Sequence, residues 1–433
     1  MRRPLVIAFS LLVIALTAVA AFAARQTASP QALVASILGS AGFHAAVAYL
    51  DRTHDQLVDE TIRLTEIPAP PFKETARATA FLELLRQAGL TAVEADPEGN
   101  VMGLRRGTAP AGGSLVAIAA HLDTVFPEGT DVKVKREGTR LAAPGISDNS
   151  RALAVMLAII RAMNDAKVQT ASDILFIGNV GEEGPGDLRG VRYLLQQGRY
   201  KDRIKNFISV DGAGGGDDIT TGGVGSKRYR VTFKGPGGHS YGAFGLVSPA
   251  FAMSNAAAKF GQVRVPFSPR TTYSIGVVGG GTSVNSIPFE TWMDIDLRSE
   301  SPVELEKLDE TVHALMKQAV IEENLARSTA QGAITLDMKL IGDRPSGQTP
   351  RSAALVQIAT AVVTAAGMTP RHSYSSTDSN MPISLGIPAI TLDSGGRGGR
   401  AHALDEWIDV EKAPSLAGIR NVLAILMAAA GTP

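Results

Sequence analysis

Short, almost wholly apolar segments alternate with helical patterns through the first half of the chain, and this feature limits the fold more than any other. The apolar segments lie at residues 115–120, 174–180 and 207–210, and helical spacing separates them at residues 152–163 and 191–197. A strand without polar alternation is buried on both faces, which is typical of a parallel sheet covered by helices. The sequence therefore predicts an α/β fold with an open, mostly parallel sheet.

Helical patterns also precede these strands, and the same alternation returns near the C-terminus. Apolar spacing predicts a helical stretch over residues 31–66, ended by a proline-rich segment, and a second helix over residues 74–88. Later in the chain the sequence predicts a helix over residues 353–366, a strand at 389–392 and a closing helix that ends near Ala430. The two ends of the chain are thus expected to build one domain together.

The pattern changes between residues 222 and 345. This segment predicts the order βαββαβ, with elements at residues 229–234, 249–260, 272–278, 289–297, 302–327 and 333–341. That order is a compact α+β unit of the ferredoxin-like, split-βαβ kind. The chain of 433 residues also exceeds the ~250–300 residues at which one core usually stops growing. We assign residues 24–221 and 346–433 to the larger domain and residues 222–345 to an inserted domain.

Composition excludes several classes of function. The chain has 42 Lys and Arg residues against 42 Asp and Glu residues, and this balance argues against nucleic acid or an anionic membrane surface as the main partner. The chain has no cysteine, which excludes disulfide scaffolds, thiolate metal sites, thiol nucleophiles and iron–sulfur clusters. Histidine, aspartate and glutamate are left as the strong metal ligands.

The N-terminal segment has the pattern of a secretory signal. Two arginines precede an apolar run over residues 5–21, which ends in the small-residue pattern Ala-Phe-Ala at residues 21–23. This arrangement predicts a signal peptide over residues 1–23 and a secreted or periplasmic mature protein without a stable membrane span. A retained anchor is the alternative, although the run is short for a span, which needs roughly 20 apolar residues.

Polar residues with metal-binding chemistry follow the predicted strands, at the edge where open α/β sheets place their ligands. His121 and Asp123 come directly after the strand at residues 115–120 and, two residues apart, share one face of an extended segment. A carboxylate so placed can hold a metal-ligating imidazole in the required tautomer. A local hydrogen bond at a polar strand end explains the pair equally well.

Further carboxylates occupy comparable positions. Asp148 precedes a predicted helix, where an aspartate ordinarily caps the helix. Glu182 and Glu183 end an apolar strand inside a glycine-rich turn, and because adjacent side chains diverge, one can bind a metal while its neighbour moves a proton. A solvated loop is the alternative for that pair. Asp211 follows the strand at residues 207–210.

One more imidazole completes the set, from a loop rich in glycine and arginine. Together the candidate ligands are His121, Asp148, Glu183, Asp211 and His402, which leaves Glu182 as a base. Two metal ions that share one carboxylate would use all five ligands. Nitrogen and oxygen ligands of this kind suit zinc, manganese or cobalt, which activate a hydroxide and polarise a carbonyl.

Taken in order, these motifs resemble those of the M20 metallopeptidases, over residues 51–428. The shared elements are the His121-Leu122-Asp123 motif, the Asp148 motif, the Glu182 and Glu183 pair, Asp211, and His402 before Leu404-Asp405-Glu406-Trp407. The resemblance implies two divalent metal ions, zinc first and cobalt or manganese as alternatives. One ion would be held by His121, Asp148 and Asp211, and the other by Asp148, Glu183 and His402.

The resemblance also implies roles for residues that are not ligands. Glu182 would be the general base, Asp123 would orient His121, and the peptide bond after Asp148 would be cis. Asp378 is expected to face a substrate's free amine, and a cap at a helix start is an equal explanation.

The inserted domain resembles the lid or dimerisation domain of that family. His239, in a Gly-Gly-His-Ser motif, matches the residue that stabilises the oxyanion on the substrate carbonyl, often across a dimer interface. A capped surface histidine is the alternative. Asn285 and Arg298 match positions that contact carboxylate or carbonyl groups of the substrate. The resemblance leaves open whether this domain also pairs two subunits into a homodimer.

The sequence thus predicts an exported dinuclear metallopeptidase that hydrolyses amide bonds in short peptides. It does not distinguish cleavage at the amino end from cleavage at the carboxyl end. An amidohydrolase that removes acyl groups from N-acyl amino acids is the alternative enzyme. A noncatalytic periplasmic binding protein on the same scaffold is a more distant alternative, because two domains around a cleft also suit ligand capture.

Overall fold

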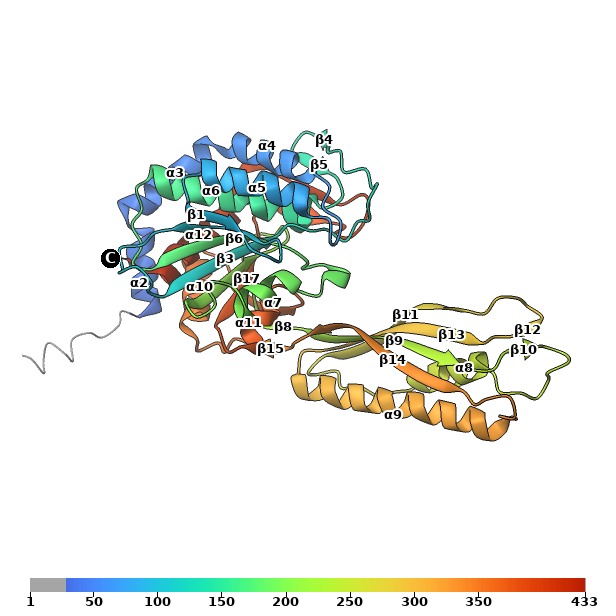
Figure 1. Ribbon diagram of the computed structural model, residues 1–433. Coiled ribbons are helices and arrows are strands. Elements are labelled where there is room, and N and C mark those ends of the chain that lie inside the picture. The colour runs from blue at the N-terminus through green and yellow to red at the C-terminus, as the bar shows by residue number, and fades with distance from the viewer. Residues whose placement is uncertain (1–28, 433) are drawn as a thin grey trace, which may run out of the picture.

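The computed structural model describes residues 29–432, and the signal peptide predicted at residues 1–23 lies outside these described residues. Figure 1 shows two parts, a larger one built around the main sheet and an elongated one that extends toward the lower right. We call the larger part the catalytic domain and the elongated part the lid, after the roles that the family resemblance implies for them.

The catalytic domain is built on a nine-stranded mixed sheet of order β1-β2-β6-β3-β7-β17-β8-β15, in which β16 also pairs with β8. Its strands are β1 (Thr91–Ala95), β2 (Val101–Arg105), β3 (Leu115–His121), β6 (Asp173–Asn179), β7 (Ile204–Val210), β8 (Asp218–Gly223), β15 (Gly347–Gln348), β16 (Arg371–Ser375) and β17 (Ala389–Leu392). The central strands β6, β3, β7 and β17 are parallel. The flanking pairs β1–β2, β2–β6, β17–β8 and β8–β15 are antiparallel. The predicted parallel arrangement therefore holds at the centre of the sheet.

Helices cover both faces of this sheet. Successive residues of a strand point to opposite sides, so alternate residues of one strand pack in two different cores. Val116 and Ile118 of β3 pack in the core that α2–α6, α10 and α12 share, whereas Leu115 and Ala117 pack in a second core with α7 and α11. The helices are α2 (Pro30–Leu38), α3 (Ala41–Arg52), α4 (His54–Thr65), α5 (Thr75–Gln87), α6 (Arg151–Asp165), α7 (Arg189–Gln196), α10 (Ala354–Ala365), α11 (Asn380–Ser384) and α12 (Lys412–Ala430).

The helical stretch predicted over residues 31–66 is three helices in the structure. Gly39 ends α2, and Ser40 begins α3 by accepting a hydrogen bond from the Phe43 N–H at 3.2 Å. α3 and α4 meet at Thr53. Apolar spacing does not reveal these breaks, because each short helix buries one face against the same core.

One described helix, α12, is long and apolar enough to cross a membrane, and the α2–α3 pair passes the same test despite a bend of 59°. In α12, however, 72% of the most apolar stretch is buried inside the protein. The core of the catalytic domain therefore accounts for its composition.

The parallel strands end at one edge of the sheet and bring the predicted ligands there. β3 ends at His121, β6 ends shortly before Glu182, and β7 ends directly before Asp211. A small sheet of order β18-β19-β5-β4 supplies the loop of His402, which connects β18 to β19. Its strands are β4 (Lys135–Glu137), β5 (Arg140–Ala142), β18 (Arg397–Gly399) and β19 (Trp407–Asp409).

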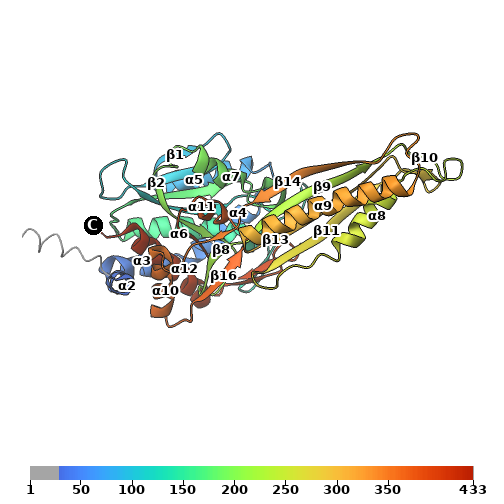
Figure 2. The same cartoon turned by 90° about the horizontal axis from the view of Figure 1, so that it is seen from below.

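The lid has the predicted order βαββαβ, so the fold class expected from the sequence is confirmed. Its antiparallel sheet of order β11-β13-β9-β14 carries two helices on one face (Figures 1 and 2). The elements are β9 (Gly225–Lys234), α8 (Pro249–Phe260), β11 (Thr271–Gly280), β13 (Glu290–Ser299), α9 (Pro302–Ala326) and β14 (Thr335–Arg344). Two linkers join the lid to the catalytic domain: Val224 between β8 and β9, and Pro345 with Ser346 between β14 and β15.

The lid extends away from the catalytic domain in both views (Figures 1 and 2). Its far end, which we call the tip, contains the short paired strands β10 (Gly238–His239) and β12 (Ser286–Ile287). Large apolar side chains are exposed in the loops around these strands, namely those of Tyr241, Phe244, Val284 and Phe289. The tip is thus an apolar surface that the described chain does not cover.

Candidate active site

The five predicted ligands converge at the carboxyl edge of the sheet around Asp148, in the short segment η1 (Ile146–Ser150). Asp148 Oδ1 lies 2.9 Å from His121 Nε2, and Asp148 Oδ2 lies 3.2 Å from His402 Nε2. Asp211 Oδ1 lies 3.6 Å from His121 Nε2, and Glu183 Oε1 lies 3.0 Å from His402 Nε2. The ligands thus form two groups, joined by the two oxygens of one carboxylate. The peptide bond between Asp148 and Asn149 is cis, as the resemblance implies.

His121 is buried, and the main chain fixes the orientation of its ring. Its Nδ1 lies 3.0 Å from the carbonyl oxygen of Asp123 and 3.7 Å from the Asp123 carboxylate. A carbonyl only accepts hydrogen bonds, so the proton sits on Nδ1 and Nε2 is free to act as a ligand. Asp123 therefore orients His121 mainly through its carbonyl group.

The carboxylate of Asp123 has a second task. Its two oxygens accept hydrogen bonds from the main-chain N–H groups of Glu182 and Glu183, at 3.0 and 2.8 Å. This contact ties the turn after β6 to the end of β3. Two of the sequence motifs are therefore held together by one buried aspartate.

The donor atoms of this cluster fit a cation. His121 Nε2 and Asp148 Oδ1 are buried close together and neither has a hydrogen-bond partner, which is the pattern expected of two atoms that share an ion. Hydrogen bonds to Asp148 and Glu183 raise the pKa of His402 to about 10, so the surroundings of this imidazole favour positive charge. Ligand atoms of His121, Asp148 and Glu183 all lie within 4.8 Å of one another, and these residues could hold a metal ion.

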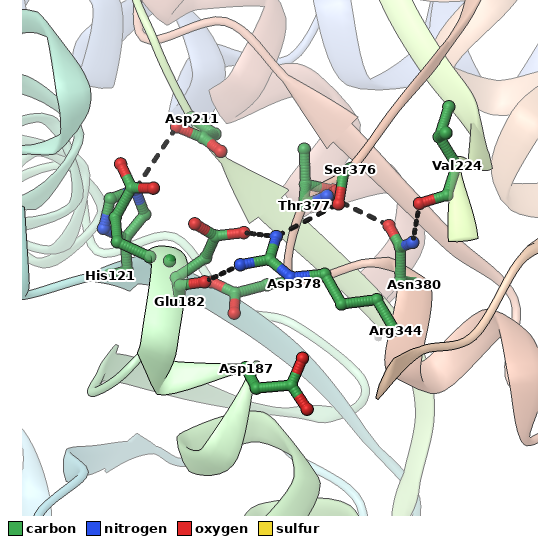
Figure 3. A network of polar contacts seen from close by, with 12 residues as sticks. His121, Glu182, Asp187, Asp211, Val224, Arg344, Ser376, Thr377, Asp378 and Asn380 are labelled. Atoms are coloured by element: carbon green, nitrogen blue, oxygen red, sulfur yellow. Dashed lines mark hydrogen bonds and ion pairs between the residues drawn. The ribbon is translucent and has the colours of Figure 1, made fainter. Parts of the chain in front are cut away.

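Glu182 is buried beside the ligands, and its closest charged partner is an arginine. Its Oε1 lies 3.0 Å from Arg344 Nη1 (Figure 3). Burial raises the pKa of Glu182 well above its usual range, and the positive charge of Arg344 opposes this shift. A carboxylate with this environment has the chemistry of a proton carrier.

Glu406 supports the central ligand and was not singled out from the sequence. It is fully buried, and its carboxylate accepts hydrogen bonds from the N–H groups of Gly145, Ser147 and Asp148, at 3.1, 2.7 and 2.9 Å. Burial raises the pKa of Glu406 to about 7. The only signal in the sequence was its place four residues after His402, within the segment that carries the family resemblance.

The structure does not bring the predicted lid residues to the ligands within one chain. His239 and Asn285 lie next to each other at the tip, because His239 pairs with Ser286 across β10 and β12. Both are exposed, and His239 Nδ1 accepts hydrogen bonds from the N–H groups of Tyr241 and Gly242. These contacts leave Nε2 as the free nitrogen of the His239 ring.

Arg298 and Asp378 lie elsewhere. Arg298 is at the linker end of β13, where its Nε donates to Asp296 Oδ2 at 2.6 Å. Asp378 is buried, and its two oxygens accept hydrogen bonds from Asn179 Nδ2 at 2.9 and 2.8 Å. Burial raises the pKa of Asp378 to about 7. Contact of either residue with a substrate stays a prediction.

A cavity of about 370 Å³ adjoins the ligands. Four carboxylates line it, those of Asp148, Asp211, Asp218 and Asp393, together with serine and threonine hydroxyls. Within residues 29–432, no lysine or arginine side chain lines this cavity. Asp148 and Asp211 are predicted metal ligands, so the remaining charges of the wall are the carboxylates of Asp218 and Asp393, which favour a neutral or positively charged group over an anion in this part of the cavity.

Comparison with known proteins places this site in a family. A model of "Peptidase family M20/M25/M40" matches residues 117–428. A succinyl-diaminopimelate desuccinylase of Cupriavidus pinatubonensis is 26% identical over 348 residues, which cover 76% of this chain and 86% of that protein.

Two solved structures share the fold. The aminopeptidase PepT of Bacillus cereus aligns with a TM-score of 0.69 and 21% identity, over 87% of this chain and 98% of that chain. The YXEP protein of Bacillus subtilis, a dinuclear metal binding peptidase from the M20 family, aligns with a TM-score of 0.64 and 17% identity, over 87% and 98% of the two chains. Because the family model covers most of its length, the chain belongs to peptidase family M20/M25/M40 and is a hydrolase rather than a noncatalytic binding protein.

Proposed function

We propose that this protein is a secreted or periplasmic, metal-dependent exopeptidase that hydrolyses amide bonds in short peptides. The observation that carries the proposal is the Asp148 carboxylate, which points one oxygen toward each of two ligand groups beside the buried Glu182. Two divalent ions suit this donor set, and we propose zinc for both. When bound, such ions supply Lewis acidity, which polarises a carbonyl and acidifies water.

Proton transfer is assigned to a side chain of the protein, and a second side chain holds it in position. Glu182 takes a proton from the attacking water and later gives it to the leaving amine. The raised pKa of Glu182 favours this exchange, because it brings the group closer to neutral pH, where both protonation states are accessible. Asp123 keeps Glu182 and Glu183 in diverging positions, so that one is free for protons while the other is a ligand.

The charge of the cavity beside the ligands favours peptides with a free amino group. The carboxylates of Asp218 and Asp393 line this cavity together with those of the predicted ligands Asp148 and Asp211, and an ammonium group would be attracted to them. An acyl group that ends in a carboxylate would be repelled. The aminopeptidase PepT shares the fold, which agrees with this preference.

Removal of an acyl group from an N-acyl amino acid is the second candidate. The observation in its favour is the 26% identity to a succinyl-diaminopimelate desuccinylase, a protein of that kind of activity by its name. The acidic cavity argues against an anionic acyl group and leaves room for a neutral one.

One experiment separates these candidates. The metal content of the purified protein is measured, and hydrolysis of a panel of di- and tripeptides, with free and blocked amino ends, is compared with hydrolysis of acetyl- and succinyl-amino acids. We expect about two metal ions per chain and chelator-sensitive cleavage of peptides with a free amino end. Two ions with cleavage of acyl substrates alone would favour the second candidate. Protein that binds no metal under any loading would contradict both.

We also propose that the lid pairs two chains and that His239 acts in the site of the partner subunit. Support comes from the position of His239 and Asn285 at the tip, next to exposed apolar side chains. The strands of the tip, β10 and β12, lie at the end of the lid that is far from the catalytic domain (Figure 1). A second copy that covers this surface would bury those side chains and could place His239 Nε2 near a substrate carbonyl.

The proposal that the protein is exported rests on its N-terminal sequence alone. We propose cleavage after Ala23, and N-terminal sequencing of the protein recovered from the periplasm or medium tests it. A mature chain that begins at residue 24 is the expected result, and a chain that keeps its first residues in the membrane fraction would contradict it.

A further inference from the structure

The roots of the lid bind the turn that carries Glu182. We call residues 182–187 the base turn. Arg228 Nη1, from β9, donates to the carbonyl oxygen of Gly184 at 3.2 Å. The N–H of Asp343, from β14, donates to both carboxylate oxygens of Asp187 at 3.0 and 3.1 Å. β9 and β14 are the strands that leave and re-enter the catalytic domain, so the base turn is bonded to both roots of the lid.

Arg344, the last residue of β14, reaches Glu182 itself (Figure 3). Its Nη1 lies 3.0 Å from Glu182 Oε1 and 3.0 Å from Ser376 Oγ, and its Nη2 donates to the main-chain carbonyl of Glu182. The side chain is only 5% exposed. Because one planar guanidinium binds both the main chain and the carboxylate of Glu182, it restricts the rotamer of that side chain.

Asn380 ties the same region to the linkers. Its Nδ2 donates to the carbonyl oxygens of Val224 and Pro345, at 2.8 and 2.9 Å, and its Oδ1 accepts from the Thr377 N–H at 3.0 Å. Figure 3 shows Asn380 beside Ser376, the residue that shares Arg344 with Glu182. The outgoing and returning linkers are therefore held by one buried amide, next to the partners of Arg344.

The burial of Arg344 needs an explanation. A buried guanidinium is unfavourable unless a carboxylate pairs with it, and the carboxylate that does so here is Glu182. Arg344 is a lid residue by its strand, where it pairs with Ser226 of β9, yet its side chain donates only to groups of the catalytic domain. Its contacts join the two domains at the residue that moves protons.

We propose that Arg344 is a positioning residue for Glu182, through which the orientation of the lid sets the position of the base. The inference rests on the proposed role of Glu182. Rotation of the lid about the linkers moves the guanidinium relative to the base turn, and a displacement of about 1 Å near the reacting atoms lowers a rate about 10²-fold. Arg344 thus couples the lid to proton transfer by acting through Glu182.

The first test is kinetic. Arg344→Ala is expected to lower kcat about 10²-fold while KM changes less than about threefold and the metal content stays at the wild-type value. Millimolar guanidinium is expected to restore part of kcat, because the ion can occupy the space that the side chain leaves. Arg230→Gln is the matched control, since Arg230 forms an ion pair with Asp294 on the exposed part of the same sheet. It is expected to keep wild-type kinetics.

The second test measures lid orientation and is independent of activity. The chain has no cysteine, so Asp202→Cys in the catalytic domain and Lys317→Cys on α9 create the only two sites for spin labels. Pulsed electron paramagnetic resonance then gives the distance distribution between the domains. We expect a broader distribution in Arg344→Ala than in the parent, and an unchanged one in Arg230→Gln.

The outcomes separate this inference from the proposed function. Unchanged kcat in Arg344→Ala, when Glu182→Gln is inactive, overturns the inference alone. Full activity of Glu182→Gln overturns the proposed function and the inference with it. A raised KM that is found with carboxylate-bearing substrates but not with their amides would make Arg344 a substrate-binding residue, which also contradicts the inference. If Arg344→Ala does not fold, Arg344→Lys, which keeps the charge but not the planar fork, gives the same test.

Discussion

The carboxyl edge of the catalytic sheet and the tip of the lid both contain residues predicted for the active site. At the sheet edge these residues are buried and close together, whereas at the tip they are exposed. At the sheet edge, His121, Asp148 and Glu183 are held within 4.8 Å of one another by buried neighbours. At the tip, His239 and Asn285 are exposed, and the contacts that hold them lie within the tip itself, in their own loops and across the β10–β12 pair.

This difference follows from what each group has to do. Ligands that share an ion bind it best when they are already held in place, and the ends of parallel strands provide that rigidity. A group that acts only on bound substrate can arrive by domain movement or from a second chain. The two regions therefore call for different tests, and the expected effects decrease from the sheet edge to the tip.

The largest effect is expected at Asp148, which serves both ligand groups. Asp148→Asn should lower metal content from about two ions per chain to one or none and reduce kcat/KM by at least about 10⁴-fold. Elemental analysis and a peptide assay measure both quantities. Asp165→Asn, a surface aspartate paired with Arg52, is the control and should change neither. Full metal content in Asp148→Asn would show that the carboxylate does not join the two groups.

Glu182→Gln should come next, with a decrease in kcat of about 10³-fold, because general acid–base catalysis contributes ~10²–10⁴-fold. Metal content should stay at the wild-type value, since Glu182 is paired with Arg344 rather than placed among the ligand contacts. Elemental analysis of the same preparation distinguishes the roles, because a loss of metal would make Glu182 a ligand.

His239→Ala should lower kcat about 10²-fold, the usual cost of removing one oxyanion donor, with unchanged metal content. If His239 acts in the site of a partner subunit, mixing this variant with Glu182→Gln and allowing subunits to exchange should restore about a quarter of wild-type activity. That figure counts the one intact site in each mixed dimer, with half of the dimers mixed. No recovery in a confirmed mixed dimer would place His239 in its own chain's site or outside catalysis.

The smallest effect on folding is expected at the tip. Phe244→Ser should change the free energy of unfolding of the monomer by less than about 0.5 kcal/mol, because this side chain is exposed in the single chain. It should nevertheless weaken the dimer, which analytical ultracentrifugation measures. Phe233→Ala, in the buried lid core, is the contrasting variant and should cost about 3–5 kcal/mol. A clear loss of stability in monomeric Phe244→Ser, measured at concentrations too low for the dimer, would mean that Phe244 supports its own lid.

The sequence was informative where function follows from position along a strand. His121 and Asp211 could be singled out because each comes at the end of an apolar run, and parallel strands end at one edge. The order of the lid elements could also be read from the spacing of apolar residues. The breaks at Gly39 and Thr53 could not, because they do not disturb that spacing.

Residues that act through tertiary contacts gave little signal. Arg344 lies 162 positions from Glu182 and ends a lid strand, so nothing in its neighbourhood of the sequence indicates a buried ion pair in the other domain. Asn380 lies in a polar segment in which the sequence points to Asp378 as a partner for the substrate amine. Its hydrogen bonds to the two linkers depend on the path of those linkers in the folded chain. Pairings across domains become visible only when the chain is folded.

Because β9 and β14 are long, one rotation of the lid at the linkers would displace its two ends by very different distances. β9 and β14 are ten residues each, and at about 3.3 Å per residue each reaches about 33 Å from the linkers toward the tip. Each 10° of rotation at the linkers would therefore carry the tip by about 6 Å, but would shift a group about 5 Å from the pivot, such as the head of Arg344, by about 1 Å. A lid that rotates in this way would act as a lever, which would move His239 far at the tip and the head of Arg344, beside Glu182, only slightly near the linkers.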